Sequence, residues 1–400
     1  MKTIIWFEMR KIMDRKINRI AMGLGILFII IVNMVIIYGD SVTIDDGTEL
    51  KGIASINSKI EAENNLTTEL SEEFLTDFIQ KYQEKTNGGF DYYLIKQAPN
   101  LYPLIADHYA EFRKDWEWED LNRISTVNGV RFYDQRTKKI DTVLNADYSY
   151  GNYTDKEKEY WLEKVETVRT PFKWGSREAW DNIWKSICFL CFELVVISVC
   201  IAPVFAGEIY YRTDSLLFCS KNGRTKLVHA KIIAAFVFTV FYIMVCSLAG
   251  SLIHIIVFGI KGWDLPVQLW NTIIPYQLNA AQACMLNLIV IILLAALLTG
   301  ISLFISAACK NQVAVLAIDM IVFFGTVFLQ ASKTSRLWNH ICYLFPLHVV
   351  DLRDVLKTYN SYQIAGHVFS YIEIIIIVYI VFTVLFTIFA GHIFKKHQVA

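Results

Sequence analysis

The sequence predicts an all-α membrane protein with six transmembrane helices and an extracytoplasmic α+β domain inserted between the first two. Of the 400 residues, 54% are hydrophobic and 14% are aromatic, more than a soluble globular chain usually carries. The apolar residues form blocks long enough to cross a bilayer core of roughly 30 Å at ~1.5 Å per residue. One long polar region, residues 40–184, separates the first block from the second.

The predicted crossings are residues 20–38, 186–206, 232–258, 284–308, 312–330 and 369–391, of which the last five fall within residues 185–396. Residues 1–19 carry six basic and two acidic side chains, a net charge of +4. The excess of basic residues places this end in the cytoplasm, and six crossings then place both termini there. Because apolar residues are mixed with the basic ones, we expect residues 1–19 to form an interfacial helix on the inner surface of the plasma membrane. Small residues at Ala296, Gly300, Ser302 and Ser306 predict close helix packing within the bundle.

Residues 40–184 contain 28 acidic and 18 basic side chains, a net charge of −10, and no cysteine, so a disulfide-stapled domain is excluded. Apolar side chains recur every four residues from Leu70 to Tyr82, which predicts a helix over residues 67–85. A second helix is expected over residues 155–168. Short strands are expected at residues 90–95, 130–133 and 140–144, the last two as a hairpin.

Two outer segments adjoin the apolar blocks. Four aromatic side chains precede the second block, and we favour an aromatic belt at the outer membrane interface over a ligand cage: they are Phe172, Trp174, Trp180 and Trp184. Residues 331–368 contain an apolar stretch that is too short to span and is broken by Pro346. We therefore expect a re-entrant or interfacial hairpin before the last crossing.

The loop of residues 207–231 is a polar, basic connection between the second and third crossings. Thr213 and Asp214 are good helix N-caps, and Asn222-Gly223 is a stop signal. Together they predict a helix of about two turns that carries the apolar side chains of Leu216, Leu217 and Phe218. So short a helix is marginal in water, and we expect it to dock on the membrane or on another protein.

No phosphate-binding G-x-x-x-x-G-K-[S/T] motif, no H-E-x-x-H and no G-x-S-x-G occurs in the sequence. Cys188 and Cys191 have C-x-x-C spacing, but they lie in an apolar run without a second pair, so we expect no metal site. No residue is proposed as catalytic. The expectation is a chain that is not itself an enzyme, binds no cofactor and does not bind nucleic acid.

Ionisable residues within the apolar blocks need a partner, water or protonation, because charges at mid-bilayer cost ~2.5 to 3.5 kcal/mol. Glu193 and Asp319 are candidates for a polar path or a proton relay. The alternative is that each is neutralised and packs against a neighbouring helix. For His254 and Glu373, near the outer ends of their blocks, we favour snorkelling to the interface.

The loop resembles the cytoplasmic loop of type 2 permeases of ATP-binding-cassette (ABC) exporters. In that pattern an acidic residue, Gly-Thr, Leu-Leu, an Arg and a Lys lead into the next span, and here Arg212 stands in place of the Gly. The Pro that often follows the Leu-Leu run is replaced by Cys219-Ser220-Lys221. Glu8, Arg10 and Lys11 look like the elbow helix of that family, and residues 344–347 look like its re-entrant region. The loop residues that match the pattern are Glu208, Thr213, Leu216, Leu217, Arg224 and Lys231, and with Arg212 and Phe218 they are the residues expected to couple to the ATPase.

The resemblance implies a permease subunit whose loop docks a separate ATPase subunit, so that the partner hydrolyses ATP. It also implies a second permease copy, or a related chain, and a substrate such as a peptide, an antibiotic, a lipid-like compound or an ion. Glu208 would pair with the basic elbow helix. Two alternatives remain open: a membrane sensor whose outer domain binds a ligand, and an intramembrane enzyme that uses Glu193 with Asp319.

Overall fold

The computed structural model describes residues 1–43, 48–66, 68–86, 98–213, 219, 223 and 225–396. Within them, five helices are long and apolar enough to cross a membrane. They are α2 (Lys16–Tyr38), the composite helix Glu178–Tyr210, α14 (Lys226–Phe258), α15 (Ala280–Ala308) and α19 (Tyr371–Lys396). The predicted helical, membrane-protein character is therefore confirmed for these segments.

The crossing predicted at residues 312–330 is shorter than the other five. It consists of α16 (Gln312–Phe324) followed by a 3₁₀ turn, η3 (Gly325–Phe328). At ~1.5 Å per residue these elements reach roughly 25 Å, less than a bilayer core of roughly 30 Å. The described part of the chain thus has five helices of spanning length, where the sequence predicted six.

The composite helix is interrupted twice, once by a 3₁₀ turn and once by a proline. It comprises α10 (Glu178–Phe189), η1 (Leu190–Phe192), α11 (Glu193–Ile201) and α12 (Pro203–Tyr210). Pro203 has no N–H to donate, so it interrupts the helix after Ala202. The chain consequently enters the loop of residues 207–231 from a separate short helix.

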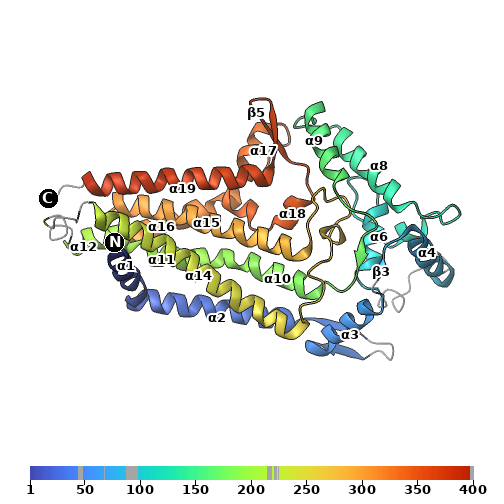
Figure 1. The fold of residues 1–400 in the computed structure, drawn as a ribbon, viewed down its shortest axis with the longest axis horizontal. Helices are drawn as coiled ribbons and strands as arrows, with labels where there is room; N and C mark the ends of the chain where they lie inside the picture. The colour runs from blue at the N-terminus through green and yellow to red at the C-terminus, as the bar shows by residue number, and fades with distance from the viewer. Residues whose placement is uncertain are drawn as a thin grey trace.

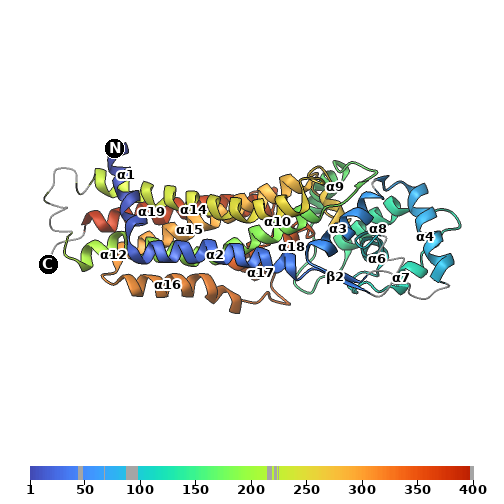
Figure 2. The ribbon, with the colours of Figure 1, turned by 90° about the horizontal axis from the view of Figure 1, so that it is seen from below.

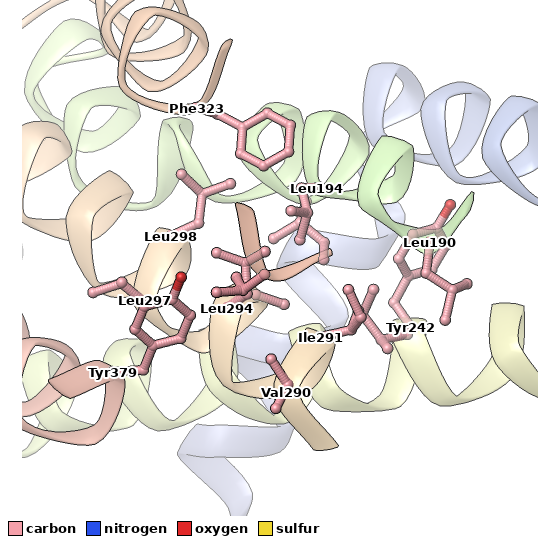
Figure 3. Packing of buried hydrophobic residues seen from close by; sticks show 14 of the residues in the cluster. Leu190, Leu194, Tyr242, Val290, Ile291, Leu294, Leu297, Leu298, Phe323 and Tyr379 are labelled. Atoms are coloured by element: carbon pink, nitrogen blue, oxygen red, sulfur yellow. The ribbon is translucent and has the colours of Figure 1, made fainter. Parts of the chain in front are cut away.

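Helix α15 occupies the middle of the bundle, where its apolar side chains meet those of α10, α11, α14, α16 and α19 (Figure 3). In this view the side chains of Leu294 and Leu298 of α15 lie below that of Phe323 of α16 and to the left of that of Leu194 of α11. Gly300 lets α15 approach α19, because a Cβ there would lie 3.3 Å from the carbonyl oxygen of Thr383. The close packing predicted from small residues is therefore present within the bundle.

The helices run along the length of the molecule, and the polar region lies at one end of them (Figures 1 and 2). The N-terminus and the last turn of α19 lie at the other end. There α1 (Lys2–Asp14) turns away from the axis of α2 at Arg15, whose backbone is extended with ψ of 128°. The helix predicted within residues 1–19 is thus present.

The polar region is mainly helical. Among its described residues the helices are α3 (Ile53–Asn64), α4 (Glu72–Thr86), α6 (Leu101–Tyr109), α7 (Glu119–Asn122), α8 (Phe132–Asn145) and α9 (Asp155–Glu166). Two short antiparallel pairs accompany them: β1 (Ser41–Thr43) with β2 (Glu49–Lys51), and β3 (Thr68–Glu69) with β4 (Lys173–Trp174). The two predicted helices correspond to α4 and α9, although α4 begins at Glu72.

The strands predicted at residues 130–133 and 140–144 are wrong, because this stretch forms most of α8. The buried side chains of α8 are Phe132, Arg136, Ile140 and Leu144, one on every fourth residue, which is the period of a helix face. Arg136 breaks the apolar pattern in the sequence and hides that period. The strand predicted at residues 90–95 lies outside the described residues.

The aromatic belt predicted before the second crossing is also wrong for three of its four members. Phe172, Trp174 and Trp184 are each 1% exposed, so they are core residues of the protein. Phe172 and Trp174 belong to the core of the polar region, and the ring of Trp184 lies 4.9 Å from that of Trp270. Aromatic residues before an apolar block were thus a sign of a packed junction.

The segment between α16 and α19 joins the bundle to the polar region. It contains α17 (Arg336–Tyr343), η4 (Pro346–Val349), α18 (Leu352–Leu356) and a hairpin of β5 (Ser361–Ile364) with β6 (His367–Ser370). Arg336 donates a 2.5 Å hydrogen bond to the carboxylate of Glu157 in α9. The Ser361 hydroxyl donates to the same carboxylate at 2.9 Å. The break at Pro346 was predicted, and the strand pair of β5 with β6 was not. That this segment is a re-entrant or interfacial hairpin stays a prediction.

Candidate functional site

A buried ion cluster lies where the loop of residues 207–231 joins the bundle. Its centre is Lys231, in the second turn of α14, with a side chain only 2% exposed. The Lys231 ammonium lies 2.7 Å from Oε2 of Glu8 in α1 and 2.8 Å from Oε1 of Glu208 in α12. One cation therefore connects the N-terminal helix to both ends of the loop.

The Glu208 carboxylate has further partners. Lys11 of α1 forms an ion pair with the Oε1 atom, and the Thr213 hydroxyl donates to Oε2. The Thr213 backbone N–H also donates to the Glu208 carbonyl oxygen at 3.0 Å. Two acidic and two basic side chains thus neutralise one another, and removal of one buried partner typically costs about 3–5 kcal/mol.

Local geometry allows α1 and α12 to approach so closely. The guanidinium of Arg15, at the junction of α1 and α2, lies 2.9 Å from the position that a Cβ of residue 207 would occupy. Gly207 leaves that space to the guanidinium, whereas a Cβ there would require the end of the flexible Arg15 side chain to move aside. Residue 207 and Glu208 are neighbours, and the same approach therefore brings the carboxylate to α1.

Arg212 adopts φ of 55°, in the left-handed region that favours glycine. It ends the turn after α12, since its backbone N–H donates to the Ile209 carbonyl oxygen at 3.1 Å. This is the position at which the permease pattern has Gly. The departure noted in the sequence therefore lies at a backbone conformation for which glycine is the least strained residue.

The structure brings together some of the predicted loop residues. Glu208, Thr213 and Lys231 meet in the ion cluster, and the predicted pairing of Glu208 with the basic N-terminal helix is present through Lys11. The predicted helix and four of its candidate docking residues lie outside the described residues. These four are Leu216, Leu217, Phe218 and Arg224.

Sequence reasoning missed the bond between Glu8 and Lys231. The available signal was an acidic residue within a basic helix, together with a lysine at the start of an apolar block. Both charges are placed where burial would be costly without a partner. Nothing in the spacing connects residues that are 223 positions apart.

Glu193 lies in a second polar cluster, against α2 and α14. The Tyr242 hydroxyl donates a 2.6 Å hydrogen bond to its carboxylate. Gly25 of α2 passes directly over this pair, and a Cβ there would collide with both side chains. Glu193 of α11 thus packs against α2 and α14, and α14 supplies the hydroxyl that binds its carboxylate.

Asp319 lies in a third cluster, on the buried face of α16. Its side chain is 0% exposed and faces the hydroxyls of Ser198 in α11 and Ser302 in α15. Neither carboxylate oxygen makes a hydrogen bond of normal geometry with a described residue. The structure therefore separates Asp319 from Glu193, and a polar path that contains both stays a prediction.

The prediction for His254 is wrong. Its side chain is 0% exposed, and its Nε2 atom lies 2.5 Å from the side-chain oxygen of Asn33 in α2. Glu373 instead remains partly exposed at the start of α19, where its carboxylate accepts a 2.7 Å hydrogen bond from the Ser370 N–H. An asparagine within the first crossing indicated a polar side chain that needs a partner, but nothing in the spacing connects Asn33 to His254.

A protein-family model described as "Protein of unknown function (DUF2705)" matches residues 159–400, more than half of the chain. No curated protein and no solved structure matches the sequence. The matched residues include Glu208, Lys231 and Asp319 and leave out α1, which supplies Glu8 and Lys11. The match thus covers the loop and the last four helices of spanning length.

Proposed function

We propose that this chain, which belongs to the DUF2705 family, is the membrane-spanning subunit of an ABC exporter driven by a separate ATPase subunit. The observation that carries the proposal is the buried ion cluster at Lys231. It fixes the start and the end of one loop to each other and to α1. A loop anchored in this way can transmit a push from a partner into α12 and α14.

In this proposal the apolar side chains of Leu216, Leu217 and Phe218 insert into a cleft of the ATPase. Arg212, Arg224 and Lys226 add charged contacts around them. When the ATPase closes on ATP, the loop moves, and the ion cluster carries that displacement to the bundle. The chain itself contains no nucleotide-binding motif, so ATP is bound and hydrolysed by the partner.

The proposed topology has six crossings, with α16 and η3 as a short fifth one. The polar region then lies outside a bacterial plasma membrane, and both termini lie in the cytoplasm, in accord with the net charges of +4 and −10 in the two segments. Two copies of the chain, or one copy with a related permease, would enclose the substrate path. The substrate would be a peptide, an antibiotic, a lipid-like compound or an ion.

Asp319 is the residue that we assign to a polar part of this path, because its carboxylate faces two hydroxyls and no cation in the described structure. An Asp319→Asn variant keeps the shape and removes the charge. Loss of efflux in Asp319→Asn, with normal membrane insertion, supports the assignment. Full efflux in this variant removes Asp319 from the mechanism.

Affinity purification from the native membrane tests the proposal. A P-loop ATPase should copurify with the wild-type chain and be lost in a Leu216→Asp, Leu217→Asp double variant. The matched control is Ile53→Asp, Val127→Asp, which places the same charges on exposed apolar positions of the polar region. If no ATPase copurifies with the wild type, the exporter proposal is abandoned.

A membrane sensor is the second candidate function, and one cavity favours it. This cavity of about 310 Å³ lies between the polar region and the bundle, and Trp116, Trp270 and Arg353 line it. The Arg353 guanidinium lies 4.5 Å from the centre of a Trp270 ring. A sensor predicts ligand-dependent signalling without an ATPase partner, so the same purification distinguishes the two functions.

A further inference from the structure

A second cavity lies at the end of the bundle where α1 is found. It has a volume of about 390 Å³ and opens between the start of α2, the junction of α11 and α12, and the start of α16. Val199, Pro203, Val313 and Leu316 form apolar walls. Arg15, which joins α1 to α2, and Lys16, the first residue of α2, stand beside these walls. The cavity therefore joins an apolar slot to a basic corner.

Among the described residues that line the cavity none is Asp or Glu, so these residues offer no acidic counterpart to the positive charge of this corner. Asp14, the adjacent acidic residue in the chain, is paired with Arg10 at 3.0 Å. Glu208, the acidic residue of α12, is already occupied by Lys11 and Lys231. Neither Arg15 nor Lys16 forms an ion pair with a residue that the structure describes.

The surroundings of the cavity are those of a membrane-facing surface. Ile17 is 69% exposed and Val313 is 68% exposed, although both are apolar. Figure 2 shows that α2 and α16 both begin at the end of the bundle where α1 lies. The basic corner thus sits at the end of two apolar helices, which is the level of lipid headgroups when α2 spans a membrane.

We propose that this cavity binds one anionic phospholipid. Arg15 and Lys16 hold the phosphate, the arginine through paired N–H donors, and an acyl chain lies against Val199, Val313 and Leu316. In other membrane proteins, basic pockets between helices bind the phosphates of anionic lipid head groups in the same way. The bound lipid would also bridge α2 and α16. This inference requires a membrane environment but does not depend on an ATPase partner.

Native mass spectrometry of the full chain tests the proposal with phosphatidylglycerol and phosphatidylcholine of identical acyl chains. We expect the wild type to retain phosphatidylglycerol in preference, and an Arg15→Gln, Lys16→Gln variant to lose about tenfold or more of that affinity. The control Lys2→Gln, Arg19→Gln removes the same charge outside the cavity and should keep the preference. Thermal unfolding in detergent shows whether each variant is folded.

A Leu316→Trp variant keeps both cations and fills the apolar slot, so it should also reduce phosphatidylglycerol retention, even if the double variant fails to fold. Equal retention of the two lipids by the wild type would overturn the proposal. Equal losses in the cavity and control variants would overturn it as well. Displacement of the lipid by an equal concentration of glycerol 1-phosphate would identify a small-anion site and contradict a lipid site.

Discussion

The Lys231 ammonium of α14 donates a 2.7 Å hydrogen bond to the Glu8 carboxylate of α1, although 223 positions separate the two residues. Both side chains are almost fully buried, and Lys231 also binds Glu208. The N-terminal helix is therefore part of the structure that holds the loop of residues 207–231. In the proposed exporter, α1 is expected to influence coupling without contacting the ATPase.

Removal of the Lys231 ammonium should destabilise the chain. A second substitution that neutralises Glu8 should restore part of the lost stability. Lys231→Met leaves Glu8 buried without a partner, which typically costs about 3–5 kcal/mol. Adding Glu8→Gln removes that uncompensated charge, while Lys11 still pairs with Glu208. Thermal unfolding in detergent should therefore rank wild type above the double variant and the double variant above Lys231→Met. A double variant less stable than Lys231→Met would contradict this account.

The left-handed backbone at Arg212 predicts a difference between two variants that both remove its side chain. Arg212→Gly relieves the strain of φ 55°, and Arg212→Ala retains it. Because a non-glycine residue pays about 1–2 kcal/mol for this conformation, the Gly variant should be the more stable of the two by about 1 kcal/mol. The unfolding midpoints of the two variants measure the difference. Equal midpoints would show that residue 212 leaves this conformation in the membrane.

Two glycines of α2 provide a matched pair. A Cβ at Gly25 would collide with the side chains of Glu193 and Tyr242, whereas a Cβ at Gly23 meets nothing within 4 Å. We expect Gly25→Ala to destabilise the chain by about 1–3 kcal/mol, as overpacking usually does, and Gly23→Ala to be neutral or stabilising. Unfolding of both variants in the same detergent tests this. A harmless Gly25→Ala would mean that α2 does not pack on the Glu193 cluster.

His108 should make the polar region sensitive to acid. Its Nε2 atom lies 2.8 Å from the Phe132 carbonyl oxygen and its Nδ1 atom 2.7 Å from the Thr272 hydroxyl, so the neutral ring donates to one and accepts from the other. Burial lowers the pKa of His108 from 6.5 to about 3, only partly offset by the Phe132 hydrogen bond. Between pH 6.5 and about pH 3 the unfolded chain binds a proton at His108 that the folded chain does not bind. The free energy of unfolding therefore falls as the pH falls, by about 1.4 kcal/mol for each pH unit below 6.5.

The corresponding measurement is the unfolding midpoint from pH 7 to pH 4 for wild type, His108→Gln and His367→Gln. The first variant should lose much of the slope below pH 6.5. The second changes an exposed histidine of the β5–β6 hairpin and should keep it. An unchanged slope in His108→Gln would assign the acid sensitivity to other groups.

The sequence predicted those parts of the fold that depend on local patterns. Long apolar blocks predicted the five helices of spanning length, because backbone N–H and C=O groups inside a membrane must be paired with each other, as they are in a helix. The apolar side chains at every fourth residue from Leu70 to Tyr82 predicted α4. Where a buried polar residue interrupts the period, as Arg136 does in α8, the pattern was misread. The aromatic residues near Trp184 were misread for a related reason, because composition alone does not distinguish an interface from a core.

The candidate site was only partly predictable. Glu208 and Lys231 were identified by the resemblance of the loop to the permease pattern, which also implied that Glu208 pairs with the basic N-terminal helix. The bond between Glu8 and Lys231 depends on how three helices meet, which no short-range pattern encodes. The φ of Arg212 and the partner of His254 likewise become visible only in three dimensions.

Photo-crosslinking from residue 217 tests the docking claim most directly. A photoreactive phenylalanine analogue is placed at Leu217 in cells, with the same analogue at the exposed Val127 as the control. The account predicts an ultraviolet-dependent adduct between position 217 and a P-loop ATPase, absent from position 127 and weakened by Lys231→Met. Crosslinking of position 217 only to lipid, or to a protein without a nucleotide-binding motif, would contradict it.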